Sequence, residues 1–153
     1  SGNDLHGTTS GNPSVENAPA GDDGLVYEEG TFTPTVSSGI TSVGYATQVG
    51  TYVRVGNLVT FQFHVVVNSG STASANFELA TLPYTPRNTS GVQGGAYVVF
   101  QDNFDEDSSE QAKFNIEPNS TTIEVFKETG SRFLGSNMDS ANITLRLVGQ
   151  YFV

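Results

Sequence analysis

An acidic run near the middle of the chain holds the side chains best suited to binding a metal ion. Asn103, Asp105 and Asp107 alternate like the first oxygen ligands of an EF-hand calcium loop. The later positions do not fit, because Ser108 stands where that loop needs glycine and Phe114 where it needs glutamate. The run is therefore not an EF-hand, and two interpretations stay open: a solvated acidic loop, which is the default, or an irregular Ca²⁺ site. The ligands expected for such a site are Asp102, Asp105 and Asp107.

General acid–base or nucleophilic catalysis finds little support in the sequence. Glu28 and Glu29 are adjacent carboxylates, but neighbouring residues of a strand point to opposite faces and cannot share one substrate. His6 and His64 are the only imidazoles, and neither belongs to a nucleophile elbow or to a spaced pair of metal-binding histidines. His64 alternates with apolar residues and is expected on the outer side of a strand. We therefore expect a protein that is not an enzyme.

Carbohydrate binding needs exposed aromatic rings that stack on sugar faces, with polar side chains beside them. Tyrosine and phenylalanine supply such rings in the expected loops, next to arginine and aspartate, although tryptophan is absent from the chain. For any single ring, the favoured alternative is a loop anchor packed on the core. The candidate ligand-binding residues are Tyr84, Arg87, Phe104, Arg132 and Phe133.

The charge of the chain excludes several classes of partner. There are 16 acidic and 6 basic residues, which give a formal net charge of -10. Such a surface repels the phosphates of nucleic acids and of anionic membranes, so neither is an expected partner. No apolar run approaches the roughly 20 residues that cross a bilayer, and no membrane insertion is expected. Because cysteine is absent, disulfides and thiolate metal sites are excluded. Apart from Ca²⁺ at the acidic run, no cofactor is expected.

The loops that carry the candidate binding residues must be positioned by strands. Only 14% of the residues are charged, and glycine, serine, threonine and valine are abundant, a composition that fits sheets and turns rather than helices. The clearest strand covers 58–67, where Phe61, Phe63 and Val65 alternate with Gln62 and His64. Strands are predicted at 30–36, 45–55, 58–67, 77–82, 96–100, 112–116, 121–126 and 142–153.

The spacing of these strands predicts an all-β fold, an antiparallel β-sandwich of the jelly-roll type with almost no helix. Gly56 and Asn57 predict a tight hairpin turn between the second and third strands, because both residues tolerate positive φ. Pro34 confines the first strand to an edge or a bulge. The core is expected to contain Phe61, Phe63, Val65, Ile143, Leu145 and Leu147.

The chain divides into two parts. Residues 1–24 are polar and rich in glycine, with no period of a strand or helix, and are expected to form an extended arm or linker. Such an arm would lie on its own domain or on a neighbouring subunit. Residues 25–153 are expected to form one β-sandwich domain.

Two motifs near the front of this domain occur in a fixed order. The first is YEEGTFTPT at 27–35, and the second is GYATQVGTYVRVGNLV at 44–59, followed by LPYT at 82–85. They resemble the carboxyl-terminal domain of bacteriophage tail fibres and tailspikes. In that family Trp usually stands where this chain has Phe32, and the half of this chain after Gly91 matches no pattern of the family. The motif residues are interpreted as turn and edge residues rather than as a binding site.

The resemblance implies a sandwich domain at the tip of a fibre, preceded by an arm from an upstream region. It implies a homotrimer located in the virion tail that attaches the virion to a glycan or protein of the host-cell surface. One alternative is a purely structural domain that trimerises and caps a virion fibre. A second alternative is an accessory domain of a tailspike that depolymerises polysaccharide.

Overall fold

The computed structural model describes residues 26–91, 94–104, 112–138 and 141–153. The expected arm of residues 1–24 lies outside these ranges, as do Asp105 and Asp107. Within them the structure contains strands and one short 3₁₀ helix, η1 (Gly135–Asn137), and no helix that is long and apolar enough to cross a membrane. The strands are β1 (Tyr27–Phe32), β2 (Thr35–Ser38), β3 (Ile40–Val55), β4 (Leu58–Thr72), β5 (Glu78–Ala80), β6 (Gly94–Asp102), β7 (Lys113–Ile116), β8 (Ile123–Phe126) and β9 (Thr144–Phe152).

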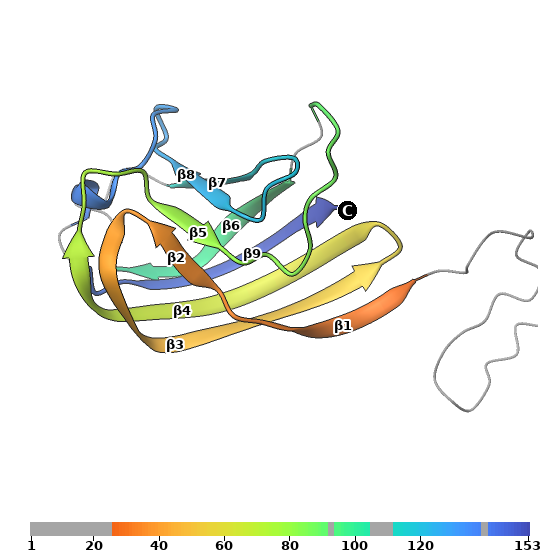
Figure 1. The fold of residues 1–153 in the computed structure, drawn as a ribbon, viewed down its shortest axis with the longest axis horizontal. Helices are drawn as coiled ribbons and strands as arrows, with labels where there is room; N and C mark the ends of the chain where they lie inside the picture. Colours follow the sequence, from red (N-terminus) through yellow and green to blue (C-terminus); the bar gives the residue numbers. More distant parts are fainter. Residues whose placement is uncertain (1–25, 92–93, 105–111, 139–140) are drawn as a thin grey trace, which may run out of the picture.

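All strands belong to one curled antiparallel sheet with the order β1-β3-β4-β9-β6-β7-β8-β5-β2. Figure 1 shows the result: β3, β4 and β9 form the lower layer, and β7 and β8 lie above it. The curl brings β2 and β5 over the lower layer, so that the two halves of the sheet enclose a core. The predicted all-β antiparallel sandwich is confirmed, with the difference that its two layers are continuous through β6 and β7.

The core lies between the two layers and follows the predicted alternation. On β4 the side chains of Phe61, Phe63 and Val65 are buried, whereas His64 between them points to the outer side. The three apolar residues predicted at the end of the chain are also buried. Each such side chain stabilises the fold by about 1.5–3 kcal/mol relative to exposure. The six predicted core residues, all confirmed, are Phe61, Phe63, Val65, Ile143, Leu145 and Leu147.

The predicted strands are present, with some different boundaries. The expected strand at 30–36 is divided at Pro34 into β1 and β2, which are the two edges of the sheet. Pro34 has no backbone N–H to donate to a neighbouring strand, so regular pairing is interrupted there. The β3–β4 hairpin is longer than predicted, because both strands continue beyond irregular pairs near Gly44. At its turn only Gly56 has a positive φ, of 59°, as in a turn with glycine at the first central position.

The two sequence motifs are partners across the β1–β3 pair. Gly30 lies opposite Tyr52, and Phe32 lies opposite Gly50, so each glycine is covered by an aromatic ring of the neighbouring strand. A Cβ atom on Gly50 would lie 2.6 Å from the Phe32 ring, and therefore that position has no room for a side chain. Gln48 Nε2 also donates a hydrogen bond of 2.9 Å to the carbonyl oxygen of Pro34. The motifs therefore hold the edge strand β1 and its exit in place.

Candidate ligand-binding site

Tyr84 is held in place after β5 by the core beneath it. Its backbone N–H donates a hydrogen bond of 3.1 Å to the hydroxyl of Tyr151, a side chain that is fully buried. The Tyr84 ring meets the Tyr52 ring edge to face, with centroids 5.5 Å apart, and the Arg54 guanidinium lies 5.0 Å from the Tyr84 centroid. The Tyr84 side chain is half-buried, so part of the ring reaches solvent. Segments distant in sequence thus form one polar aromatic cluster.

Glu28 gives this cluster its negative charge. The Tyr52 hydroxyl donates a hydrogen bond of 2.7 Å to Glu28 Oε1 and lies 3.5 Å from the Tyr84 hydroxyl. The hydroxyl groups of Tyr84 and Tyr52 stabilise the carboxylate and lower the pKa of Glu28 below its usual value. Hydrogen bonds with Tyr84, and then with Glu28, raise the pKa of Tyr52. Burial raises the pKa of Tyr151 to about 12. At neutral pH the ionised Glu28 carboxylate therefore lies beside the protonated hydroxyl of Tyr52.

Arg87 lies on the same loop and is exposed. Its backbone N–H donates a hydrogen bond of 2.7 Å to the carbonyl oxygen of Phe152, and its guanidinium donates one of 3.2 Å to that of Val153. The guanidinium also lies 5.9 Å from the Phe152 ring centroid. These contacts fix the loop against the end of β9. Tyr84 and Arg87 are thus the two predicted ligand-binding residues that the structure leaves accessible on a single loop.

Phe104 and Phe133 lie in the core instead. Their side chains are 1% and 2% exposed, and their rings stack with centroids 4.8 Å apart. Phe77 packs on both rings. A sugar could stack on Phe104 or Phe133 only if this part of the core opened, so the structure favours the loop-anchor interpretation for these two residues. They are buried because a large apolar loop residue gains more by covering the sandwich than by facing water.

Arg132 is committed to two carboxylates. Its guanidinium forms ion pairs with Glu78 on β5 and Glu124 on β8, which lie directly opposite each other in the sheet. The guanidinium also lies 5.0 Å from the Phe126 ring centroid. Two carboxylates paired across strands would repel each other, and Arg132 removes that repulsion. Its position explains a role in stability more directly than a role in ligand binding.

The calcium hypothesis concerns residues that are mostly outside the described ranges. Asp102 is exposed at the end of β6, opposite Thr144 of β9. Asp105 and Asp107 are not among the described residues. Within the described ranges, no group of three or more histidines and carboxylates could hold a metal ion. The calcium site thus stays a prediction.

Sequence reasoning missed Glu28, Tyr52 and Arg54 as members of the site. The sequence places Glu28 and Tyr52 in motifs that serve the strand edge, and the structure confirms that location. No signal within the sequence sets the β1–β3 register, because no tight turn joins these two strands. The hairpin turn at Gly56 fixes only the pairing of β3 with β4.

No protein-family model matches the chain, and no curated protein matches it. Among solved structures, the crystal structure of the Dettilon tailspike protein is similar, with a TM-score of 0.63 and 23% sequence identity. The chain shares the fold of part of this tailspike. The match covers 84% of the chain and 24% of the tailspike chain, so the chain spans about a quarter of the length of that protein.

Proposed function

We propose that this chain is a domain of a bacteriophage tail fibre or tailspike that attaches the virion to a glycan or protein on the host-cell surface. The observation that carries the proposal is the fold shared with the Dettilon tailspike protein over 84% of the chain. The two sequence motifs of the β1–β3 pair support it, because they resemble those of tail-fibre domains. The proposal places the chain in the virion tail, acting outside the host cell and without catalysis.

The cluster around Tyr84 is the proposed point of contact with a host glycan. An aromatic ring offers a sugar an apolar face, and the neighbouring Glu28 carboxylate accepts hydrogen bonds from sugar hydroxyls. Arg54, which lies against the Tyr84 ring, and Arg87, which is on the same loop as Tyr84, supply hydrogen-bond donors. Because Tyr52 packs against the Tyr84 ring and the Tyr151 hydroxyl holds the Tyr84 backbone, little entropy is lost when a ligand binds.

Binding to intact bacteria tests this proposal. The purified chain is labelled and applied to a panel of strains, with and without periodate oxidation of the surface glycans or protease treatment of the surface proteins. We expect binding to some strains that periodate abolishes, and Tyr84→Ala should weaken it about 5- to 150-fold, since one stacking contact is worth roughly 1–3 kcal/mol. Binding that protease abolishes instead would identify a surface protein as the target.

Tyr27→Ala is the matched control, because Tyr27 is an exposed tyrosine on β1 that points to the face opposite Glu28. Its binding should equal that of the wild type. Tyr84→Phe keeps the ring and removes the hydroxyl beside Glu28, so it separates stacking from hydrogen bonding. Absence of binding to every strain, or equal loss in Tyr84→Ala and Tyr27→Ala, would contradict the proposed site.

A homotrimer is part of this proposal, as the resemblance to fibre tips implies. The structural alternative, a domain that trimerises and caps a fibre, predicts assembly without any binding to cells. The remaining alternative, an accessory domain of a depolymerase, predicts that the chain binds polysaccharide and that the polysaccharide is cleaved only when the rest of the protein is present. Turnover of the bound polysaccharide by the chain alone would contradict the proposal that it is not an enzyme.

A further inference from the structure

One face of the sheet carries most of the exposed apolar side chains. This is the outer side of β3, β4, β9 and β6, which points away from the core in Figure 1. The register aligns its residues in rows across the four strands; one row is Thr51, Gln62, Val148 and Tyr97. We call this surface the outer β-face. Its most exposed apolar side chains include Val49, Val53, Tyr97, Val99, Phe100 and Phe152.

The exposed apolar side chains of the outer β-face form a group and are not scattered single residues. Tyr97 is 64% exposed, Val99 59% and Val49 56%, and they come from strands on both sides of β4 and β9. Scattered apolar residues are normal on a protein surface, but a contiguous patch marks an interaction surface. The patch is also built on regular strands, so it presents a fixed shape to whatever covers it.

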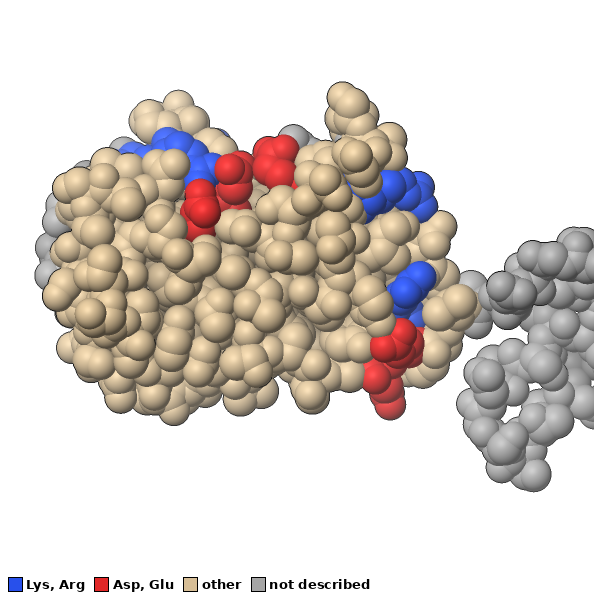
Figure 2. Space-filling model, in the orientation of Figure 1, with Lys and Arg blue, Asp and Glu red and all other residues tan. Residues whose placement is uncertain are grey.

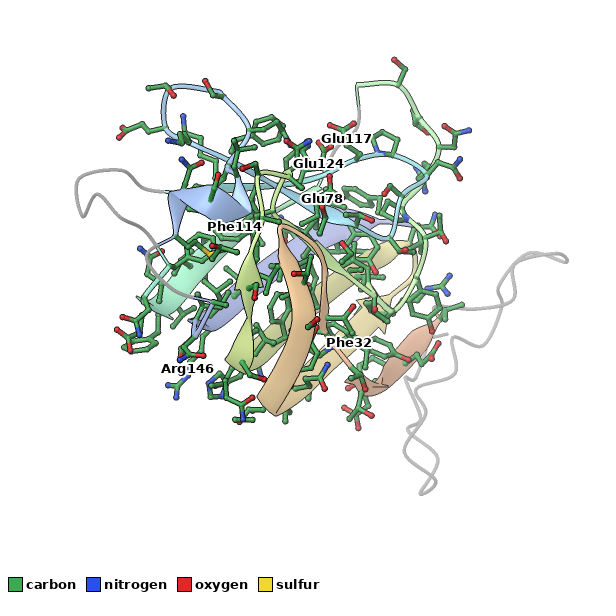
Figure 3. All side chains as sticks on the ribbon, turned by 60° about the vertical axis from the view of Figure 1, so that its left-hand side comes forward. Phe32, Glu78, Phe114, Glu117, Glu124 and Arg146 are labelled. Atoms are coloured by element: carbon green, nitrogen blue, oxygen red, sulfur yellow. The ribbon has the colours of Figure 1, made fainter. Side chains whose placement is uncertain are left out.

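The distribution of charge on this face suits a second copy of the chain. Among the described residues, carboxylates of this face lie at its margins: Glu29 on the edge strand β1, and Asp102 at the end of β6. Its interior has Arg146, whose guanidinium lies 5.4 Å from the Phe100 ring centroid. Figure 3 shows Arg146 far from Glu78, Glu117 and Glu124, which gather on the other side of the molecule. Two chains of charge -10 repel each other least where carboxylates are sparse.

The outer β-face has hollows as well as projecting aromatic rings. A shallow groove of about 250 Å³ runs along its centre between Val49, Gln62, His64 and Val148. A second hollow, of about 530 Å³, lies beside Tyr97 and is lined by Thr60 and Gln150. Projecting rings and hollows both occur on this surface, so one copy can place a ring in a hollow of the next.

From this geometry we infer that the outer β-face is the surface through which copies of this chain associate. The apolar interior with charges at the rim has the anatomy of a protein–protein interface. The inference deepens the assembly part of the proposed function by naming the face, and it does not depend on binding to a host. A chain that associates through this face but binds no cell would keep the inference and contradict the proposed attachment role.

The test measures the mass of the full chain by light scattering coupled to size exclusion at micromolar concentration. The wild type should have a mass of at least two chains, each of 16.2 kDa. The double variant Tyr97→Glu and Val99→Glu places two carboxylates among the most exposed apolar side chains of the face without touching the core, so its mass should fall to that of one chain. Far-UV circular dichroism should remain that of a β protein, which shows that the variant still folds.

A matched control adds the same charge elsewhere. The double variant Thr129→Glu and Ser131→Glu changes two exposed residues of the turn after β8, and it should leave the oligomeric mass unchanged. A wild type that is monomeric at tens of micromolar would overturn the inference, as would a Tyr97→Glu and Val99→Glu variant that keeps the wild-type mass. If the wild type is monomeric and removal of residues 1–24 increases binding of an apolar dye, the arm covers the face instead, which also overturns it.

Discussion

The two outer sides of the curled sheet use the same strand pattern for opposite purposes. On the outer β-face, the outward positions of β3, β4, β9 and β6 are mainly valine, threonine, glutamine and aromatic residues, together with His64 and with Arg146 as the charged residue of its interior. On the opposite layer, the outward positions of β5, β7 and β8 carry Glu78, Lys113 and Glu124, with Arg132 between the carboxylates. Figure 2 shows acidic and basic side chains lying close to one another at the upper edge and at the lower right of a surface that is otherwise uncharged.

This difference shows what alternation in a strand does and does not specify. Among the described residues, the buried inward positions of both layers are apolar, because both face the same core. The outward positions depend on what covers them. Charged side chains that pair with one another are suited to water, whereas an apolar outer face gains free energy only when another surface covers it. We therefore expect the two faces to respond differently to substitution.

The largest effect should come from the core that both layers share. Phe61 packs on Phe63, Tyr151 and Phe32, and its side chain is 2% exposed. Phe61→Ala should lower the free energy of unfolding by about 3–5 kcal/mol, because it leaves a cavity. Thr60→Ala, its exposed neighbour on β4, should change it by no more than about 0.5 kcal/mol. Urea unfolding of both variants checks this, and similar losses would contradict the assigned faces of β4.

A smaller effect should come from the charged layer. Arg132→Ala leaves Glu78 and Glu124 opposite each other without a cation, and should cost about 1–2 kcal/mol, since these side chains are partly buried. The double variant Arg132→Ala and Glu124→Gln should regain part of this loss, because the repulsion is removed. Arg146→Ala, on the other face, should cost less than Arg132→Ala. Thermal unfolding gives the order, and the reverse order would contradict the difference between the faces.

The smallest effect should be the pH dependence of His64 on the apolar face. Burial, and then the positive charge of Arg146, lower the pKa of His64 below its usual value of 6.5. The unfolded chain therefore binds a proton at His64 more readily than the folded chain does. The stability that neutral His64 contributes to the folded state is complete above pH 6.5 and is lost as the pH falls below 6.5.

Substitution separates this effect from the titration of carboxylates. The decrease in Tm from pH 8 to pH 5 should be smaller in His64→Gln than in the wild type. His6→Gln removes the other imidazole and serves as the control, with the decrease of the wild type. An equal decrease in all three proteins would show that His64 does not contribute.

The sequence by itself determined the strands and much of the core. Alternation has a period of two, so Phe61, Phe63 and Val65 had to share one side of β4, and Leu145 and Leu147 one side of β9. Those residues carry the signal locally, and no knowledge of their partners is needed. Pro34 also confined its segment to a sheet edge or a bulge without help from the fold, because it lacks the N–H that a central strand donates, and the strands on either side of it are the two edges.

The tertiary structure alone decided the fate of residues without such a period. Phe104 follows β6, and Phe133 lies between β8 and η1. Whether an aromatic ring in a loop faces water or the core depends on the packing of distant segments. Here the two rings stack on each other. Tyr84 meets Tyr52 and Glu28 because the sheet curls and β1 pairs with β3, a pairing between strands that no tight turn connects. The outer β-face likewise exists only after β6 pairs with β9, since adjacency across strands comes from hydrogen bonding between segments far apart in the chain.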